Sequence, residues 1–209
     1  MRQYNESVSK LLPLFPLDLV LLPGTALPLH IFEPRYREMI GECLETKQAF
    51  GVVRTLEEGL AELGCTAEIE SVVKRYEDGR LDILTSGRRR FELIRVNEVR
   101  AFAQAEVLYF DDQSDDALPA ERIAEAVALQ RELLQLGGLA DETNPQHRQL
   151  SFHLAGSLPL DLDFKQALLA MRSERERLDK LIEYYEQLLP KLRRVLKNRT
   201  RSAGNGHVM

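Results

Sequence analysis

The sequence predicts an α+β protein, in which a small barrel of bent mixed or antiparallel β-sheet precedes a bundle of helices. Three observations support this fold class. Short runs of alternating apolar residues fill the first half of the chain. An acidic run at residues 111–116 ends that alternation, and the apolar residues beyond it repeat with a helical period. We expect a barrel subdomain with one early helix at residues 1–112, a helical subdomain at 113–201 and a disordered tail at 202–209.

The opening segment, Leu12 to Met39, carries apolar residues interrupted by prolines and one glycine. Each proline removes a backbone donor and fixes φ, so a continuous helix is excluded. Short extended pieces joined by tight turns remain, and Pro23-Gly24 is the clearest turn signal. Pro34 suits the first turn of a helix, which we expect to continue to about Glu45. The segment therefore predicts strand, turn, strand and helix.

The next strands are predicted at residues 50–53, 64–76, 81–96 and 102–110, with a loop at residues 56–62. The alternation slips near Val72-Val73, which indicates a bulge. Asp78-Gly79 predicts a type I′ hairpin turn, and Gly87 is expected to interrupt the returning strand. Several short strands at close spacing favour a barrel over parallel βαβ units.

Helix signals dominate after residue 116. Pro119 opens a helix that is expected to end at Gly137-Gly138, and Asn144-Pro145 predicts the start of a second helix, which would run to about Ala155. Asp163 and Ser173 are the expected caps of a third and a fourth helix. Within the fourth helix, Pro190 should produce a kink or divide the helix in two. Its predicted apolar face comprises Leu178, Leu181, Ile182, Tyr185, Leu188 and Leu189.

The composition is typical of a globular protein that needs no metal or disulfide for stability. The chain has 209 residues, of which 44% are hydrophobic and 29% are charged. Its formal net charge of -5 argues against a general nucleic-acid binder. Cys43 and Cys65 lack a partner motif and are predicted to be buried, reduced thiols, as in a cytoplasmic protein. No run approaches the roughly 18 apolar residues that span a bilayer, so a membrane is not an expected partner.

No sequence motif predicts a catalytic, cofactor or metal site. The G-x-S-x-G elbow, the G-x-x-x-x-G-K-[ST] and G-x-G-x-x-G loops and the H-E-x-x-H motif are all absent. His147 and His153 are spaced so that they would lie on different sides of a helix. The carboxylate pairs at residues 57–58 and 111–112 stand in polar surroundings and are predicted to be solvated. We therefore expect no catalytic residue, no cofactor and no metal ion.

Two segments supply candidate binding residues. His30, Ile31 and Phe32 precede the predicted helix, and with Tyr36 they would line an apolar groove for an extended chain. The alternative is that Ile31 or Phe32 belongs to the core and that His30 is an ordinary satisfied polar residue.

The second segment is Arg88-Arg89-Arg90, whose alternation puts Arg88 and Arg90 on one side of the strand and Arg89 on the other. Arg88 and Arg90 are the candidates here. A solvated strand end, a salt bridge to the acidic run, and contacts to a phosphate or a carboxylate remain open readings of this segment.

Several motifs, in order and spacing, carry a family resemblance: LFPL at residues 14–17, LPG at 22–24 and LPLHIFEPRY at 27–36. They resemble the opening of the N-terminal substrate-binding domain of Lon protease, a family that includes proteins made of this domain alone. Residues 64–67 and 79–91 resemble the family's middle, and residues 150–181 resemble its helical end. The resemblance implies a PUA-like barrel followed by a helical bundle, a part in selecting unfolded or tagged polypeptides, and no catalytic residue.

The sequence carries neither a Walker A loop nor room for ATPase and peptidase modules, so we expect a stand-alone recognition module and not an enzyme. Its expected partners are unfolded or extended polypeptide segments, together with a protease or chaperone acting in trans. RNA binding through residues 88–90 and the basic run at 191–201 is the alternative from another class. A small-molecule site or a hydrolase would require a deep pocket lined by His30 or Arg88.

Overall fold

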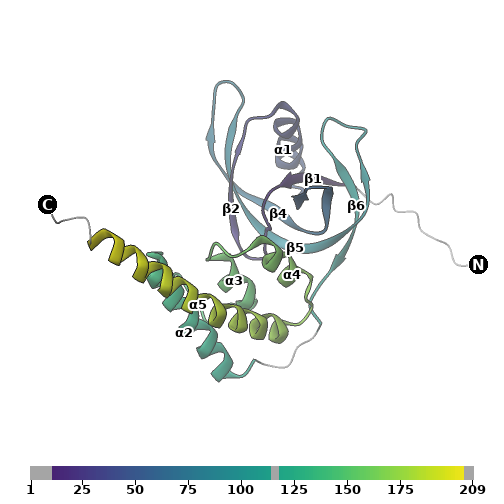
Figure 1. The fold of residues 1–209 in the computed structure, drawn as a ribbon. Helices are drawn as coiled ribbons and strands as arrows, with labels where there is room; N and C mark the ends of the chain where they lie inside the picture. The colour runs from purple at the N-terminus through teal and green to yellow at the C-terminus, as the bar shows by residue number, and fades with distance from the viewer. Residues whose placement is uncertain (1–10, 114–117, 205–209) are drawn as a thin grey trace, which may run out of the picture. The chain divides into compact units, whose positions relative to one another are not determined.

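The structure is a computed structural model that describes residues 11–113 and 118–204 (Figure 1). It divides into two compact units. The first unit contains the chain up to Asp111 and the segment Leu160–Ala170, and the second contains Asp112–Pro159 and the chain from Met171 onward. The last helix reaches Gly204, so residues 202–204 of the expected tail are helical. Residues 205–209 of that tail lie outside the described residues.

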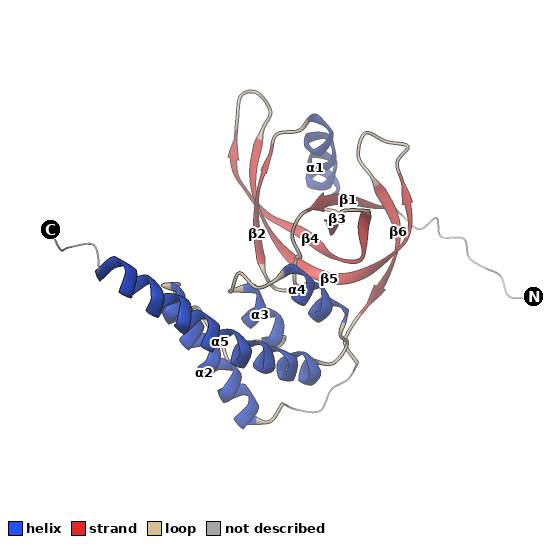
Figure 2. Cartoon of the chain, viewed as in Figure 1, coloured by secondary structure: helices blue, strands red, loops and turns tan. Residues whose placement is uncertain are grey.

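The first unit is built on a six-stranded sheet that curls into a closed ring (Figure 2). The strand order is β2-β5-β4-β3-β1-β6, and β6 also pairs with β5, which closes the ring through β1, β3, β4, β5 and β6. Only the β1–β3 pair is parallel in this described sheet, so the sheet is mixed as predicted. The strands are β1 Leu12–Leu17, β2 Ala26–Ile31, β3 Phe50–Leu56, β4 Gly59–Arg75, β5 Leu81–Asn97 and β6 Gln104–Phe110.

Helix α1, Pro34–Thr46, begins at the predicted proline and lies between the β4–β5 and β5–β6 hairpins (Figure 1). Its buried residues are Tyr36, Met39, Ile40 and Cys43, whose spacing puts them on one face of the helix. The Tyr36 ring stacks on Phe15 of β1 with the ring centroids 4.2 Å apart. The proline-rich opening therefore contributes two strands and the helix that packs into the barrel core.

Gly87 does not interrupt β5, contrary to the sequence prediction. It lies where the backbone of β5 comes close to the backbone of the turn before β2. A Cβ atom at this position would lie 2.2 Å from the carbonyl oxygen of Leu22. Gly87 N donates to Thr25 O at 2.9 Å, and Gly87 O accepts from Gly24 N at 2.9 Å. The glycine thus lets the turn before β2 pack directly on β5.

The loop predicted at residues 56–62 is instead the tight turn of the β3–β4 hairpin. Leu56 pairs with Gly59, and the strand continues from Gly59 without a break. Gly59 has a φ of +90°, a backbone conformation that favours glycine. The charged pair at residues 57–58 did not indicate a hairpin, because polar residues occur both in tight turns and in longer loops.

The β4–β5 hairpin is confirmed, but its turn is not type I′. That turn requires a positive φ at both central residues, and Lys47 is the only non-glycine residue with a positive φ in the described part of the chain. Gly79 has a φ of +85°. Tyr76 O accepts from Gly79 N, and Tyr76 N donates to Arg80 O, both at 3.0 Å. The connection is therefore a three-residue loop with glycine in the left-handed position.

Helix α4, Leu162–Ala170, comes from the C-terminal half of the sequence but packs in the barrel unit. Arg54 of β3 forms an ion pair with Asp163 at 2.5 Å, and Gln166 Nε2 donates to the carbonyl of Leu63 at 3.0 Å. The predicted helix is present, but its capping side chain is Asp161, whose carboxylate accepts from Phe164 N at 3.0 Å.

The second unit consists of α2 Ala120–Gly137, α3 Leu150–Gly156 and α5 Glu174–Gly204. Helix α2 ends at Gly138, whose φ of +66° matches the predicted glycine stop. The Ser173 cap of α5 is also confirmed, since its Oγ accepts from Glu176 N at 3.3 Å. None of the helices in the described ranges is both long and apolar enough to cross a membrane.

One predicted helix start in this unit is wrong, and one of the two alternatives for Pro190 is excluded. The helix expected from Asn144-Pro145 begins only at Leu150, because the Asn144 carboxamide accepts from Gln146 N at 3.1 Å and forms a turn. Pro190 does not divide α5, which continues through it. The apolar face before the proline, which includes Leu178, Tyr185 and Leu189, is buried and packs that part of the helix into the unit.

A buried ion network ties the second unit together around Arg177, which has no exposed surface. Its guanidinium donates to the Asp112 carboxylate at 2.7 and 2.5 Å and to Glu174 at 2.6 Å. Glu174 in turn accepts from the backbone and the hydroxyl of Ser151. Asp112 was predicted to be part of a solvated acidic run, but its carboxylate is a fixed partner of a buried cation.

Candidate functional site

Among the described residues of the barrel unit, the most exposed aromatic side chain lies where β2 ends beside the β4–β5 hairpin. The exposed fraction of Phe32 is 59%. Its ring stacks on His30 with a centroid distance of 6.0 Å, and His30 meets Tyr76 edge-on at 5.7 Å. We call this group the Phe32 cluster, and its members are His30, Phe32, Lys74, Tyr76, Arg80 and Asp82.

Hydrogen bonds fix the polar members of the Phe32 cluster. His30 Nδ1 lies 2.5 Å from Asp82 Oδ1, and the Tyr76 hydroxyl donates to Asp82 Oδ2 at 2.8 Å. The hydrogen bonds from His30 and Tyr76 lower the pKa of the Asp82 carboxyl below its ordinary value. Asp82 therefore remains a carboxylate at neutral pH and holds both rings in place.

Two cations cover the Tyr76 ring, namely Lys74 with its Nζ 4.4 Å from the ring centroid and Arg80 with its Cζ 4.8 Å away. Such contacts are worth roughly 0.5–1 kcal/mol at an exposed site. Phe32, which stacks on His30 in the same cluster, is largely uncovered. The cluster therefore combines an open apolar ring with a fixed polar surround.

Strand register explains how residues so far apart in sequence come together. His30 pairs with Asp82 across β2 and β5, and Asp82 pairs with Lys74 across β5 and β4. Cross-strand partners lie on the same face of a sheet, so these three side chains form one row. The sequence contained no signal for Lys74, Tyr76 or Asp82 as site residues, because the register of the hairpin is a tertiary property.

The structure separates the predicted candidates of the first segment. His30 and Phe32 are exposed in the cluster, whereas the exposed fraction of Ile31 is 1% and its side chain faces the core. Tyr36 is also buried, and burial raises the pKa of its hydroxyl above the ordinary value. His30 and Phe32 alone among these four lie at the surface.

The arginine segment is arranged differently from the predicted alternation. The pairing of Cys65 with Arg90 and of Ala67 with Gly87 leaves an extra residue in β5, which is a bulge. Arg88 is exposed and pairs with Glu68 at 2.7 Å, while Arg90 is buried and donates to the carbonyl of Leu169 at 3.0 Å. Arg88 and Arg90 therefore do not share a face.

Arg89 provides the predicted salt bridge to the acidic run, with its Nη2 3.2 Å from the Asp111 carboxylate. Each arginine of the segment thus has a protein partner. This arrangement weakens the RNA-binding alternative, because phosphate contacts need cations that are free to pair with the nucleic acid.

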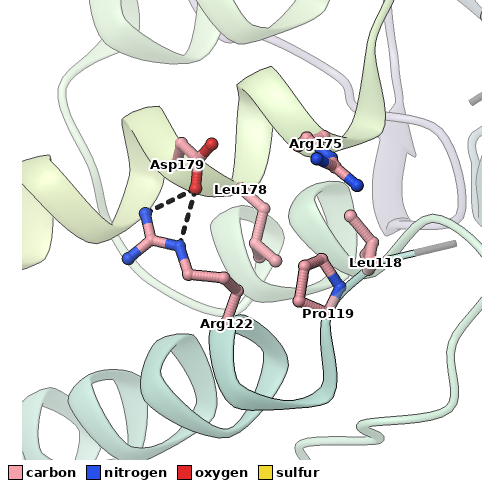
Figure 3. Close-up of a pocket in the computed structure, with 6 residues that line it drawn as sticks. All are labelled: Leu118, Pro119, Arg122, Arg175, Leu178 and Asp179. Carbon is pink, nitrogen blue, oxygen red and sulfur yellow. Dashed lines mark hydrogen bonds and ion pairs between the residues drawn. The ribbon is translucent and has the colours of Figure 1, made fainter. Parts of the chain in front are cut away.

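A pocket in the helical unit is a second candidate site (Figure 3). Arg122 points across it to Asp179 of α5, with Nε 2.8 Å from Oδ1. The volume of this pocket is about 210 Å³, which is below the range of about 300–1,000 Å³ typical of small-molecule sites. It is lined by Leu118, Pro119, Arg122, Arg175, Leu178 and Asp179.

The titratable groups outside these places form no catalytic constellation in the part of the chain that the structure describes. Burial raises the pKa of the Cys65 thiol to about 12, which keeps it protonated and unreactive. No cluster of three or more metal-ligating side chains occurs among the described residues. His147 and His153, predicted to lie on different sides of a helix, stack at 4.9 Å because His147 precedes α3.

The fold places the chain among proteins that combine a closed mixed β-barrel with a C-terminal helical unit. Residues 11–187 match the family model described as the ATP-dependent protease La (LON) substrate-binding domain. The chain therefore belongs to this family, as the motifs of its opening segment suggested.

Relatives and solved structures agree with this assignment. The chain is 32% identical over 124 residues to a Lon protease of Parabacteroides distasonis and 27% identical over 187 residues to Lon protease 1 of Hydrogenovibrio crunogenus. These matches cover 56% and 81% of this chain but only 15% and 23% of the relatives.

A Lon N-terminal domain protein from Xanthomonas campestris superimposes with a TM-score of 0.68 at 32% identity, over 83% of this chain and 98% of that one. The N-terminal domain of a Mycobacterium avium complex Lon protease has the same fold, with a TM-score of 0.62 at 21% identity, over 85% and 98% of the two chains.

Proposed function

We propose that this chain is a non-catalytic polypeptide-recognition module that binds unfolded or extended segments of other proteins. Its membership in the substrate-binding domain family supports the class of ligand. The observation that carries the proposal in this chain is the Phe32 cluster, an open aromatic ring in a fixed polar surround. Cys43 and Cys65 are buried and form no disulfide in the described part of the chain, which is consistent with work in the cytoplasm.

The physical basis is the free energy of covering Phe32. Burying a whole phenylalanine side chain is worth about 1.5–3 kcal/mol, so covering the exposed part contributes on the order of 1–2 kcal/mol. A folded protein keeps its apolar side chains inside, whereas an unfolded segment offers them to this ring. The cluster therefore favours unfolded chains without reading a defined sequence.

The module is proposed to act as a binding protein without ATPase or peptidase activity of its own, and to serve a protease or a chaperone in trans. The curated Lon proteases are several times longer than the matched region, and their proteolytic activity is not transferred to this chain. Nucleic acid is a disfavoured ligand, because Arg88 and Arg89 pair with carboxylates and Arg90 is buried.

A titration with a permanently unfolded protein, such as reduced and alkylated α-lactalbumin, tests this function. We expect Phe32→Ser to weaken binding about five- to thirtyfold. Ile94→Ser is the matched control, because Ile94 is 58% exposed on β5 and lies outside the cluster. Absence of binding by the folded wild-type protein, or equal losses in both variants, would contradict the proposal. Binding of RNA with a steep salt dependence would favour the alternative.

A further inference from the structure

Strand β2 differs from every other strand of the described sheet in its number of neighbours. It pairs only with β5, whereas each remaining strand has partners on both sides along at least part of its length. The ring closes without β2, which lies outside it as an added strand. Within residues 11–113 and 118–204, one edge of β2 therefore has no strand partner, and the Phe32 cluster lies at the end of β2.

The register identifies the backbone groups on this open edge. Thr25 O accepts from Gly87 N, and the same ladder continues with Leu27 opposite Thr85 and Leu29 opposite Ile83. Hydrogen-bonded pairs alternate with non-hydrogen-bonded pairs in an antiparallel ladder. The residues between them, Ala26, Pro28 and His30, therefore direct their backbone groups away from β5. All three are exposed.

A second open edge of the described sheet, on β4, is protected in a way that β2 is not. Residues 68–75 of β4 pair with β5 but extend beyond β3. That stretch contains two register shifts and carries charged side chains, including Glu68, Glu70 and Lys74. Bulges and charges are the usual means of blocking an added strand. β2 has neither, and its one protective residue is Pro28.

Pro28 also decides between two possible occupants of the edge. In a symmetric antiparallel pairing of two copies about Pro28, the central pair would lack both donors, and each Pro28 carbonyl would face the ring nitrogen of the other proline. A foreign strand supplies its own N–H to the Pro28 carbonyl and pairs normally with Ala26 and His30. The edge thus suits a strand from another polypeptide better than a second copy of itself.

We propose that an extended segment of a client polypeptide adds to the free edge of β2 and pairs with the backbone of Ala26, Pro28 and His30. This inference rests on the proposed function and specifies how the client is held. Main-chain pairing gives affinity without reading the client's sequence. Alternate client side chains then meet Phe32 and His30 on one face and the neighbours of Leu27 and Leu29 on the other.

A backbone N-methylation scan tests the proposal. The probe is the tightest-binding decapeptide from a set that tiles the unfolded α-lactalbumin sequence. Methylation removes one N–H at a time and leaves the side chains intact. Strand addition predicts that methylation weakens binding at least tenfold at alternate positions in the centre of the peptide and has little effect at the positions between.

Two variants of the protein complete the test. Ala26→Pro removes a donor from the open edge and should weaken peptide binding about two- to tenfold, with Ala26→Ser as the control. Pro28→Ala restores a donor and should tighten binding by a similar factor. The backbone groups of Ala26 and Pro28 point away from β5, so neither substitution removes a hydrogen bond between β2 and β5.

The outcomes separate the mode of binding from the function. Binding that is indifferent to the position of the methyl group, together with unchanged affinity in Ala26→Pro, overturns strand addition and leaves the proposed function standing. A concentration-dependent dimer of the wild-type protein that Ala26→Pro abolishes assigns the edge to a second copy and also overturns the proposal. Failure of the unfolded protein and of every peptide to bind overturns both.

Discussion

Arg90 of β5 donates a hydrogen bond to the carbonyl of Leu169 at the end of α4, with Nη1 3.0 Å from the oxygen. The exposed fraction of Arg90 is only 2%, and its guanidinium lies 4.7 Å from the centroid of the Phe110 ring. The residues are distant in sequence, but both belong to the barrel unit. A buried arginine therefore attaches the late helix α4 to the early strands.

Replacing Arg90 by alanine should destabilise the protein by about 2–3 kcal/mol, because it leaves the Leu169 carbonyl unsatisfied and removes a packed side chain. Arg89→Ala is the control at the adjacent exposed position and should change the free energy of unfolding by less than about 0.5 kcal/mol. Urea denaturation measures both. Equal stabilities of the two variants would show that Arg90 is not part of the barrel's support.

Arg177 should be among the most sensitive positions of the helical unit. Replacing it by leucine leaves the carboxylates of Asp112 and Glu174 without their shared cation, and breaking a buried ion pair costs about 3–5 kcal/mol. Arg193→Leu serves as the control. Arg193 lies on α5 like Arg177, but it is exposed and pairs with Glu132 of α2. Thermal unfolding that is equally displaced in both variants would contradict this role of the network.

The stability of the segment before α3 should decrease in mild acid. His153 Nε2 accepts a hydrogen bond from Asn144 N at 3.0 Å. Burial, and secondarily the nearby His147, lower the pKa of His153, while Glu142 acts in the opposite direction. Because its folded pKa lies below its unfolded value, His153 contributes stability that is present above about pH 6.5 and is lost as the pH falls through the folded pKa.

We therefore expect the free energy of unfolding to drop more between about pH 7 and pH 5 in the wild type than in His153→Gln, which cannot be protonated. An NMR titration of the histidine ring protons should also give His153 a midpoint below that of a free histidine. A midpoint above it, or identical pH profiles for the two proteins, would rule out this assignment.

Cys65 should resist thiol reagents in the folded protein. Its side chain is buried, and burial raises the pKa of the thiol to about 12, so the reactive thiolate is scarce at neutral pH. In a Cys43→Ala background, labelling of Cys65 should require unfolding and should follow the denaturation curve. Rapid labelling under native conditions would mean that the barrel opens around β4 far more often than its packing indicates.

The sequence was sufficient to predict the elements that local rules determine. Pro34 marked the start of α1, and Gly138 and Ser173 ended α2 and capped α5 as expected. Each of these signals depends on backbone chemistry within a few residues. The mixed sheet followed by helices was also predictable, because the periodicity of apolar residues changes where the sheet ends.

Features that depend on long-range packing could not be predicted. The bulge in β5 buries Arg90 beside α4, although alternation placed it with Arg88 on one face. Asp112 looked solvated because its partner Arg177 lies 65 residues away. In the candidate site, His30 and Phe32 were identified from their own segment, but Tyr76 and Asp82 reach them only through the register of the β4–β5 hairpin.

The most direct test of the account is amide hydrogen exchange of the intact protein with and without a saturating unfolded client. Strand addition to β2 should increase protection in the segment from Gly24 to Phe32. The amides of Ala26 and His30 should be among those slowed, since neither has a partner in the β2–β5 ladder. Unchanged exchange in that segment, with new protection confined to the exposed surface around Ile94 and Leu108 or to the helical unit, would contradict it.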